Sequence, residues 1–367
     1  MGILLKSSVA VLILLLVLLS LTCDKSPTGP EPLKDPRTYT WTIDTLAYPG
    51  SFQTAMRDIW GSSPNDVYVI GHNFLNYGLM WHFDGLRWTD VKLSTMQGGA
   101  IAGAIDLSAI YGFAANDIWA VGEHIFSNPN PPPNLLDSSL IIHYDGVQWR
   151  EQIVRPRRAL WSISGSSPTD LWACGTDGTL YHYDRTEWEE DSVSVWVPQD
   201  GVFALWDIKA KSSSEVYMIG YVHQNSLGLT KQYFLMRQRN SWIIVDSSIA
   251  EPGHLDIRFG TNGLWVSPEG TLYSFGPHIF RWTGSSWTKI YETMDALRRL
   301  GGTSDENIFA VGDFGKVLHY NGTDWFQLRQ FEDLKVVYTA VWTNGDEVMI
   351  VGFTVDYPQK TLILHGK

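Results

Sequence analysis

The stretch HYDGVQW (143–149) recurs along the chain, and this repetition decides the fold. Close copies are HFDGLRW (82–88), HYDRTEW (182–188) and HYNGTDW (319–325), and RWTGSSW (281–287) begins with Arg instead of His. A catalytic motif normally occurs once, because one pocket needs one set of groups, whereas a motif repeated at intervals marks a repeated structural unit. The motif is therefore evidence about architecture, and function must be sought elsewhere in the chain.

Each copy lies within a longer unit that opens with an apolar stretch and a polar turn. The clearest openings are DIWGSSPNDVYVIG (58–71), AIYGFAANDIWAVG (109–122), SISGSSPTDLWACG (162–175) and RLGGTSDENIFAVG (299–312), with looser copies at 207–220, 258–267 and 340–352. A variable segment, a strand, an Asp-Gly or Asn-Gly turn and a strand beginning at Trp follow. We expect type I′ turns with positive φ at both central residues. Seven units of four strands and roughly 40 to 50 residues have the dimensions of propeller blades.

The seventh unit ends at residues 362–367, where its fourth strand should begin. The segment TYTWTIDTL (38–46) matches the fourth-strand segments SSWTKIYET (285–293) and LRWTDV (86–91). We therefore expect the N-terminal strand to complete the last blade and close the ring, which removes an open sheet edge. The predicted fold is all-β: residues 38–367 form one seven-bladed β-propeller of four-stranded antiparallel blades.

These units resemble those of secreted bacterial seven-bladed β-propellers of the WD40-like and Asp-box-like kind. The resemblance covers nearly everything after residue 37. It implies the fold and says little about function, since propellers host many unrelated tasks.

One histidine and one tryptophan recur per unit, and both sets are interpreted as structural. Because neighbouring sheets pack about 10 Å apart, equivalent histidines of different blades cannot converge on one metal ion. We expect each to hydrogen-bond to a turn residue of its own blade, as in the similar His and Asp network of WD40 blades, and each Trp to pack between blades. The histidines are His82, His143, His182, His319 and His365; the turn residues are Asp66, Asp117, Asp170 and Asn307; the tryptophans are Trp41, Trp88, Trp149, Trp188, Trp242, Trp287 and Trp325. No metal site and no cofactor are predicted.

The N-terminal end is typical of an exported protein. Residues 1–22 are predicted to be a signal peptide, in which Lys6 precedes an apolar run (9–19) shorter than the about 20 residues that span a bilayer. The ending Ser20-Leu21-Thr22-Cys23 resembles a bacterial lipoprotein signal, which implies lipidation at Cys23; an ordinary secretory peptide cut nearby is the alternative. Residues 23–37 then form the anchor cysteine and a Pro-rich tether. We expect a monomer anchored by lipid in the bacterial envelope, with the outer membrane or cell surface favoured.

Charge and cysteine content narrow the function classes. A net charge of −12 argues against a nucleic-acid partner, because phosphate binding relies on clustered Lys and Arg. With Cys23 lipidated or removed, Cys174 is the only remaining thiol, so a disulfide framework is excluded. Cys174 occupies a strand position held by apolar residues in other units, and we expect it to be a small buried side chain.

Segments that differ between units are the expected place for binding residues, since loops on a rigid scaffold carry function. The connection between the second and third strands is short in blades 3, 5 and 6 (175–180, 267–272 and 312–318) and long in blades 1, 2, 4 and 7 (71–80, 122–139, 221–233 and 353–361). These connections emerge on one face, and we expect those of blades 7, 1 and 2 to form one wall beside the central channel. The predicted exposed ligand-binding residues are Phe74, Tyr77, His124, Phe126, Asn128, His223, Tyr233, Asp356 and Tyr357.

The preferred function is a binding or scaffolding module, without catalytic residues, that presents this face to an envelope protein or an extracellular glycan. The alternative is a hydrolase or lyase acting on an extracellular polysaccharide through Asp106, Asp200 or Asp256 at the channel mouth. Four arginines near inner strands, Arg57, Arg258, Arg298 and Arg299, leave a sialidase open, although the sialidase spelling Ser-x-Asp-x-Gly-x-Thr-Trp does not occur.

Overall fold

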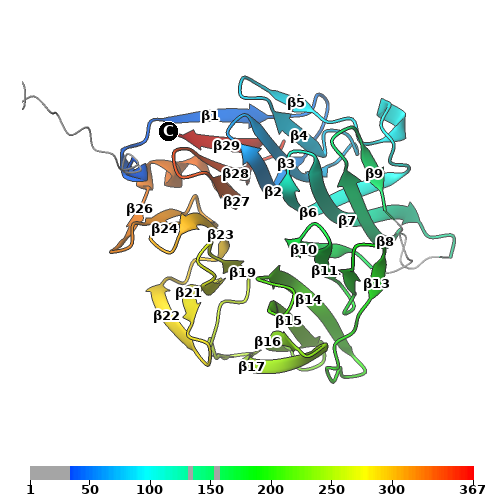
Figure 1. Cartoon of the computed structure of the whole chain (residues 1–367), viewed down its shortest axis with the longest axis vertical. Coiled ribbons are helices and arrows are strands. Elements are labelled where there is room, and N and C mark those ends of the chain that lie inside the picture. Colours follow the sequence, from blue (N-terminus) through cyan, green and yellow to red (C-terminus); the bar gives the residue numbers. More distant parts are fainter. Residues whose placement is uncertain (1–33, 131–134, 153–157) are drawn as a thin grey trace, which may run out of the picture. The chain divides into compact units, whose positions relative to one another are not determined.

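The computed structural model describes residues 34–130, 135–152 and 158–367, and within Asp35–Lys367 seven antiparallel sheets follow one another around a ring (Figure 1). In every sheet the strands pair in chain order from the first strand outward, apart from the strand that closes the ring. The predicted all-β seven-bladed propeller is therefore confirmed.

The first four blades contain strands β2 to β18. Blade 1 is β2 (Thr54–Ser63), β3 (Asp66–Asn73), β4 (Met80–Phe83) and β5 (Trp88–Asp90); blade 2 is β6 (Ala104–Ala114), β7 (Asp117–Ser127), β8 (Leu135–Tyr144) and β9 (Trp149–Glu151); blade 3 is β10 (Leu160–Ser167), β11 (Asp170–Gly175), β12 (Leu180–Tyr183) and β13 (Trp188–Glu190); blade 4 is β14 (Gly201–Ala210), β15 (Val216–Gln224), β16 (Leu229–Gln238), β17 (Ser241–Glu251) and β18 (His254–Leu255).

The remaining blades contain β19 to β29 and β1. Blade 5 is β19 (Gly263–Val266), β20 (Leu272–Phe275), β21 (His278–Trp282) and β22 (Trp287–Glu292); blade 6 is β23 (Leu297–Ser304), β24 (Asn307–Gly312), β25 (Val317–Tyr320) and β26 (Trp325–Gln327); blade 7 is β27 (Val336–Thr343), β28 (Val348–Thr354), β29 (Thr361–Gly366) and β1 (Trp41–Leu46). Three short 3₁₀ helices, η1 (Pro36–Thr38), η2 (Thr95–Gln97) and η3 (Arg329–Leu334), complete the described elements. Among the described residues, no helix has the length and apolar character needed to cross a membrane.

The ring is closed by the N-terminal strand, as predicted. β1 pairs antiparallel with β29 from Trp41 opposite Gly366 to Leu46 opposite Thr361. Two further backbone hydrogen bonds extend this ladder, from Thr40 N to Lys367 O (2.9 Å) and from Lys367 N to Thr40 O (3.1 Å). The last blade thus gains its fourth strand from the other end of the chain.

Each repeated histidine hydrogen-bonds to a residue of its own blade, which confirms the structural interpretation of these histidines. The contacts are His82 with Asp66 (2.8 Å), His143 with Asp117 (2.8 Å), His182 with Asp170 (2.7 Å), His319 with Asn307 (2.9 Å) and His365 with Glu347 (2.6 Å). Three of the rings also stack on an aromatic residue of the second strand, as His143 does on Trp119 with centroids 3.9 Å apart. Burial lowers the pKa of His319 to about 4, so this ring is neutral near pH 7.

The fourth-strand tryptophans pack between blades, also as predicted. Trp188 of blade 3 lies edge-on to Trp119 of blade 2 with centroids 5.8 Å apart, and Trp242 of blade 4 lies 5.6 Å from Trp172 of blade 3. Such contacts between large aromatic surfaces hold adjacent sheets at fixed spacing.

Cys174 is fully buried in β11, and burial raises the pKa of its thiol well above the ordinary value.

The third-to-fourth connections spelled Asp-Gly or Asn-Gly differ from the predicted type I′ turns, whereas in blade 4 both residues of the two-residue turn, Arg239 (φ 47°) and Asn240 (φ 66°), have positive φ. In blade 1 four residues separate β4 from β5, and of these only Gly85 has positive φ (90°). The carboxylate of Asp84 accepts hydrogen bonds from the backbone N–H groups of Leu86 and Arg87, both at 2.9 Å. The turn prediction was wrong because the Asp side chain, rather than a second positive φ, organises the turn.

Three of the second-to-third connections also differ from prediction. In blades 2 and 4 the inserted residues lengthen the strand pairs β7–β8 and β15–β16 instead of forming loops, although residues 131–134 of the blade 2 segment lie outside the described residues. In blade 5 the turn after β19 (267–270) joins the first and second strands, and Gly276–Pro277 joins the second and third.

Candidate functional site

A β-bulge interrupts the first strand of six blades at one equivalent position. A bulge leaves one residue unpaired and redirects its side chain. The bulged residues are Arg57, Ser108, Trp161, Trp206, Arg298 and Thr339. All six line one cavity, and Asn262 lines it from blade 5, so every blade contributes a side chain at this level.

A glycine of the second strand allows each bulge. In blade 3, Gly175 pairs with Leu160, the residue before the bulged Trp161. A Cβ on Gly175 would lie 1.9 Å from the carbonyl oxygen of Ala159, so only glycine fits this close approach of two backbones. The repeated Val-Gly and Ile-Gly pairs lie in the second strands. They therefore indicate where the neighbouring first strand bulges and which of its residues face the channel.

This cavity, which we call the channel mouth, has a volume of about 520 Å³. Its other lining residues are Glu123, Ser162, Asp207, Arg299 and Phe353. Glu123 and Phe353 follow the glycines of β7 and β28, so the cavity opens toward the second-to-third connections, the face with the long segments. Its volume lies within the roughly 300–1,000 Å³ typical of ligand pockets.

Two tryptophans form the apolar part of the channel mouth. Trp161 and Trp206 meet edge to face, with ring centroids 4.8 Å apart and planes at 70°. The Trp206 indole N–H donates to the carbonyl oxygen of Asn262 (3.0 Å), which fixes its orientation. Because 41% of Trp206 remains exposed, a fixed aromatic surface faces solvent inside the cavity.

The arginines of the channel mouth are paired with carboxylates. Arg57 contacts the Asp106 carboxylate at 3.1 Å, and this carboxylate also contacts His72 Nδ1 at 3.1 Å. Arg298 pairs with Asp313. Charge at the mouth is thus largely compensated within the protein.

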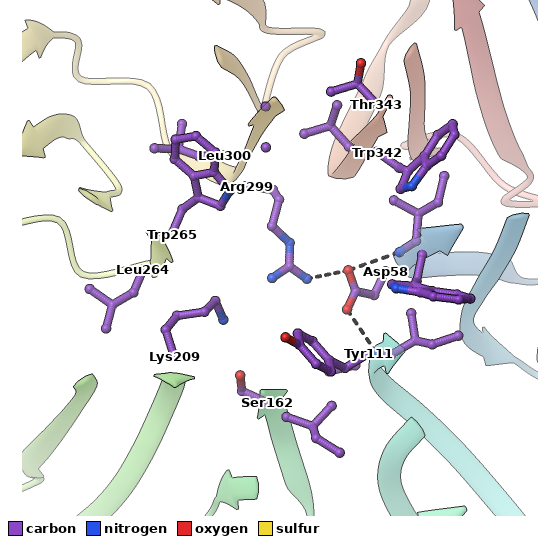
Figure 2. Close-up of a pocket in the computed structure, with 18 residues that line it drawn as sticks. Asp58, Tyr111, Ser162, Lys209, Leu264, Trp265, Arg299, Leu300, Trp342 and Thr343 are labelled. Atoms are coloured by element: carbon purple, nitrogen blue, oxygen red, sulfur yellow. Dashed lines mark hydrogen bonds and ion pairs between the residues drawn. The ribbon is translucent and has the colours of Figure 1, made fainter. Parts of the chain in front are cut away.

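Deeper in the channel, two buried aspartates each connect three blades. The Asp58 carboxylate of blade 1 accepts from Arg299 of blade 6 (2.6 Å), as Figure 2 shows, and also from the Ile110 backbone N–H of blade 2 (3.0 Å). Burial raises the pKa of Asp58, and the Arg299 charge opposes that effect. The surrounding pocket of about 240 Å³ is lined by residues of all seven blades.

Asp207 connects the other side of the ring. Its carboxylate accepts from the Ser162 hydroxyl of blade 3 (2.5 Å) and from the Leu264 backbone N–H of blade 5 (2.7 Å). Lys209 Nζ contacts the same carboxylate at 2.5 Å. The two carboxylates thus connect the first strands of six blades in two groups of three. This network makes the base of the channel mouth rigid.

Glu123 is the titratable group of the channel mouth whose pKa departs most from its ordinary value. Burial raises the pKa of Glu123 from 4.5 to about 7, and the charges of Asp106 and Asp137 act in the same direction. The Arg57 charge opposes them. The Glu123 carboxyl is therefore protonated in a substantial fraction of molecules near pH 7.

The predicted ligand-binding residues differ in exposure. Exposed are Phe74, Phe126, Asp356 and Tyr357; partly buried are Tyr77, His124, Asn128 and His223; buried is Tyr233. The expectation that Tyr233 is exposed was wrong, because it lies in β16 with its side chain in the core of blade 4 (6% exposed). His124 contacts Glu151 (3.2 Å) and His223 contacts Thr230 (2.8 Å), both within their own blades.

The segments of blades 7 and 1 do adjoin, and they carry an exposed group of aromatic side chains that we call the aromatic rim: Phe52, Phe74 and Tyr357. The Phe52 and Tyr357 rings stack with centroids 5.0 Å apart and planes at 15°. The Phe74 backbone N–H donates to Gln53 O (3.1 Å). Sequence reasoning missed Phe52 because it lies in the linker before β2 and not in a second-to-third connection.

The acidic residues of the enzyme alternative are engaged separately. Asp106 pairs with Arg57 and His72, Asp200 accepts from Ser226 N (2.8 Å), and Asp256 pairs with Arg258 (2.7 Å). Within the described residues, no group of three or more His, Cys, Asp or Glu side chains is arranged to hold a metal ion. Cys23 lies outside the described residues, so its lipidation stays a prediction.

Comparison with known proteins places the fold. No protein-family profile and no curated protein matches the sequence. Among solved structures, YCF48 bound to D1 peptide aligns with TM-score 0.58 and 13% identity over 92% of this chain and 98% of that chain. YCF48 from Cyanidioschyzon merolae gives 0.52 and 9% over 88% and 98%, and the WD40 β-propeller domain of Doa1 gives 0.54 and 11% over 90% and 97%. The chain is thus a seven-bladed propeller of WD40-like fold, and at these identities the likeness extends to fold alone.

We predict that Glu123→Gln changes stability in a pH-dependent way. Because the pKa of Glu123 is raised in the folded chain, the folded state binds more protons than the unfolded state between pH 4.5 and about 7, and wild-type stability falls as pH rises through this window. The uncharged amide removes this loss, so the variant should melt higher than wild type at pH 8 and equally at pH 4. Thermal denaturation from pH 4 to 8 measures this, with the exposed Glu187→Gln as control. A difference independent of pH would contradict the raised pKa.

Proposed function

We propose that this chain is a protein-binding propeller of the bacterial cell envelope, held to a membrane through lipid on Cys23. The observation that carries the proposal is the aromatic rim: Phe52, Phe74 and Tyr357 are 58%, 64% and 61% exposed on one face. Exposed aromatic side chains that lie together are characteristic of protein interaction sites, where a few such residues dominate the binding energy.

The rim is rigid enough to act as a preformed contact surface. The Gln359 backbone N–H donates to Phe52 O (3.0 Å), and the Thr54 N–H donates to Gln359 O (3.0 Å), so the linker before β2 and the blade 7 segment form one hydrogen-bonded unit. Ordering costs on binding are therefore small, which favours affinity.

The place where the described chain enters the propeller agrees with this proposal. Arg37, just before β1, pairs with Asp324 (3.0 Å) in the turn between β25 and β26. That turn and the start of β1 lie at the end of the blades opposite to the second-to-third connections, because strands alternate in direction. Anchoring through this end of the chain would leave the rim accessible to a partner.

The peptide bound by YCF48 supports a protein partner for a propeller of this architecture. The partner of this chain is expected to offer an apolar or aromatic surface to the rim. Catalysis is not part of the proposal, since the acidic residues of the enzyme alternative are each engaged by a different neighbour.

Replacing both stacked rings tests the rim. The variant Phe52→Ala/Tyr357→Ala should lower recovery of cross-linked envelope partners by about tenfold or more, since hot-spot aromatics contribute on the order of 2 kcal/mol each. Quantitative mass spectrometry after cross-linking of the intact chain in its membrane measures this. Phe314→Ala is the matched control, because Phe314 is an exposed Phe (75%) of blade 6 outside the rim. Equal recovery by the double variant and wild type would overturn the rim as the binding site.

Fractionation tests the anchor. We expect Cys23→Ala to move the chain from the membrane fraction to the soluble fraction or to leave an uncut precursor, because the only predicted lipid attachment is gone. Immunoblotting of fractions and the intact mass of the chain measure both results. A variant that is processed and membrane-bound like wild type would show that Cys23 is not the anchor.

A further inference from the structure

We propose that the channel mouth binds an uncharged carbohydrate, with one sugar ring stacked on Trp206 and its hydroxyl groups bonded to the polar residues around it. This site shares no residue with the aromatic rim, and the inference holds or fails independently of the proposed protein partner. It rests on the shape of the cavity, on its aromatic pair and on the state of its charges.

The cationic side chains of the channel mouth are compensated by carboxylates of the protein. Arg57, Arg298 and Arg299 each contact a carboxylate of the protein, Asp106, Asp313 and Asp58 respectively. Lys209 contacts Asp207 in the same way. An anionic ligand would have to displace one of these pairs, which leaves the displaced partner unpaired in a confined site. The remaining carboxyl of the lining, Glu123, is kept partly neutral by burial, which raises its pKa. The cavity therefore favours a ligand that carries hydrogen-bonding groups without net charge.

Trp206 gives the channel mouth a fixed aromatic surface. The edge-to-face contact with Trp161 and the hydrogen bond to Asn262 O hold the Trp206 indole in one orientation. The C–H face of a pyranose is apolar and flat, and it packs on an aromatic ring much as another ring does. An exposed, immobilised indole inside a concave cavity matches such a face.

Polar groups that donate and accept hydrogen bonds lie beside the Trp206 indole in the lining of the channel mouth. Asn262 donates through Nδ2 to Leu297 O (2.9 Å), and within the part of the chain that the structure describes its amide oxygen remains able to accept. Ser108 contributes a hydroxyl, which both donates and accepts, and Glu123 contributes a carboxyl. Sugar hydroxyls likewise donate and accept at once, so this lining suits them better than it suits an apolar ligand.

Tryptophan fluorescence of the intact chain, solubilised in a detergent without sugar headgroups, tests the proposal. The probes are cellohexaose, maltohexaose and chitohexaose, with hexagalacturonate as the charged comparator and an uncharged proline-rich hexapeptide as the peptide comparator. We expect at least one neutral hexasaccharide to change the emission saturably and to protect it from acrylamide quenching. A stronger response to the charged saccharide, a response to the peptide alone, or no response to any neutral saccharide would overturn the inference.

Variants locate the binding. Trp206→Ala should raise Kd for the responding saccharide by about tenfold or more, whereas Trp206→Phe should keep it within about threefold. Trp196→Ala is the matched control, since Trp196 is 77% exposed and outside the cavity. Equal losses in the Trp196 and Trp206 variants would place the carbohydrate elsewhere and overturn the assignment. If Trp206→Ala does not fold, Trp206→Phe and the acrylamide protection of the unaltered chain decide the outcome.

Discussion

The pairing of β1 with β29 is the constraint on which the rest of the molecule depends. In the last blade β1 covers the edge of β29 and joins the two ends of the chain in one sheet; without β1 the edge of β29 would be open, and an open edge invites aggregation. Trp41 reinforces this closure by packing edge-on against Phe331, with centroids 4.9 Å apart. By joining the two ends of the chain in one sheet, this pairing helps to hold the blades in a ring around the channel.

Closure also makes the buried charges tolerable. An isolated buried carboxylate is costly, and its cost falls only when charged and backbone donors reach it in good geometry. Asp58 and Asp207 obtain those donors from neighbouring blades, and the Arg299 partner of Asp58 comes from two blades away. These pairs in turn hold the floor beneath the channel mouth, where the bulged side chains face solvent. Ring closure, buried ion pairs and the candidate site are therefore mechanically linked.

The features that recur in every blade could be predicted from the sequence, whereas the shared position of the side chains that line the channel mouth could not. The histidine contacts and the closing strand were predictable because local chemistry recurs in every blade. Arg57 and Arg298 were singled out as arginines near inner strands, but the common position of the bulged residues was not predicted. Arg57, Trp206 and Thr339 share no chemistry, and each position depends on a second-strand glycine, such as Gly71, that pairs with the residue before the bulge. Tyr233 was misplaced for a related reason: an insertion between strands looks the same in sequence whether it forms a loop or lengthens the hairpin.

The most direct test of ring closure by β1 compares the melting temperatures and association states of three chains. In one, residues 38–46 are deleted; in a second, the same residues are moved to follow Lys367 through a short linker, which the hydrogen bonds between Thr40 and Lys367 show to be geometrically accessible; the third is unaltered. We expect the deletion to lower the melting temperature by roughly 10 °C or more and to promote aggregation, and the permuted chain to recover both properties. A deletion variant that stays monomeric and melts with the unaltered chain would contradict closure by β1.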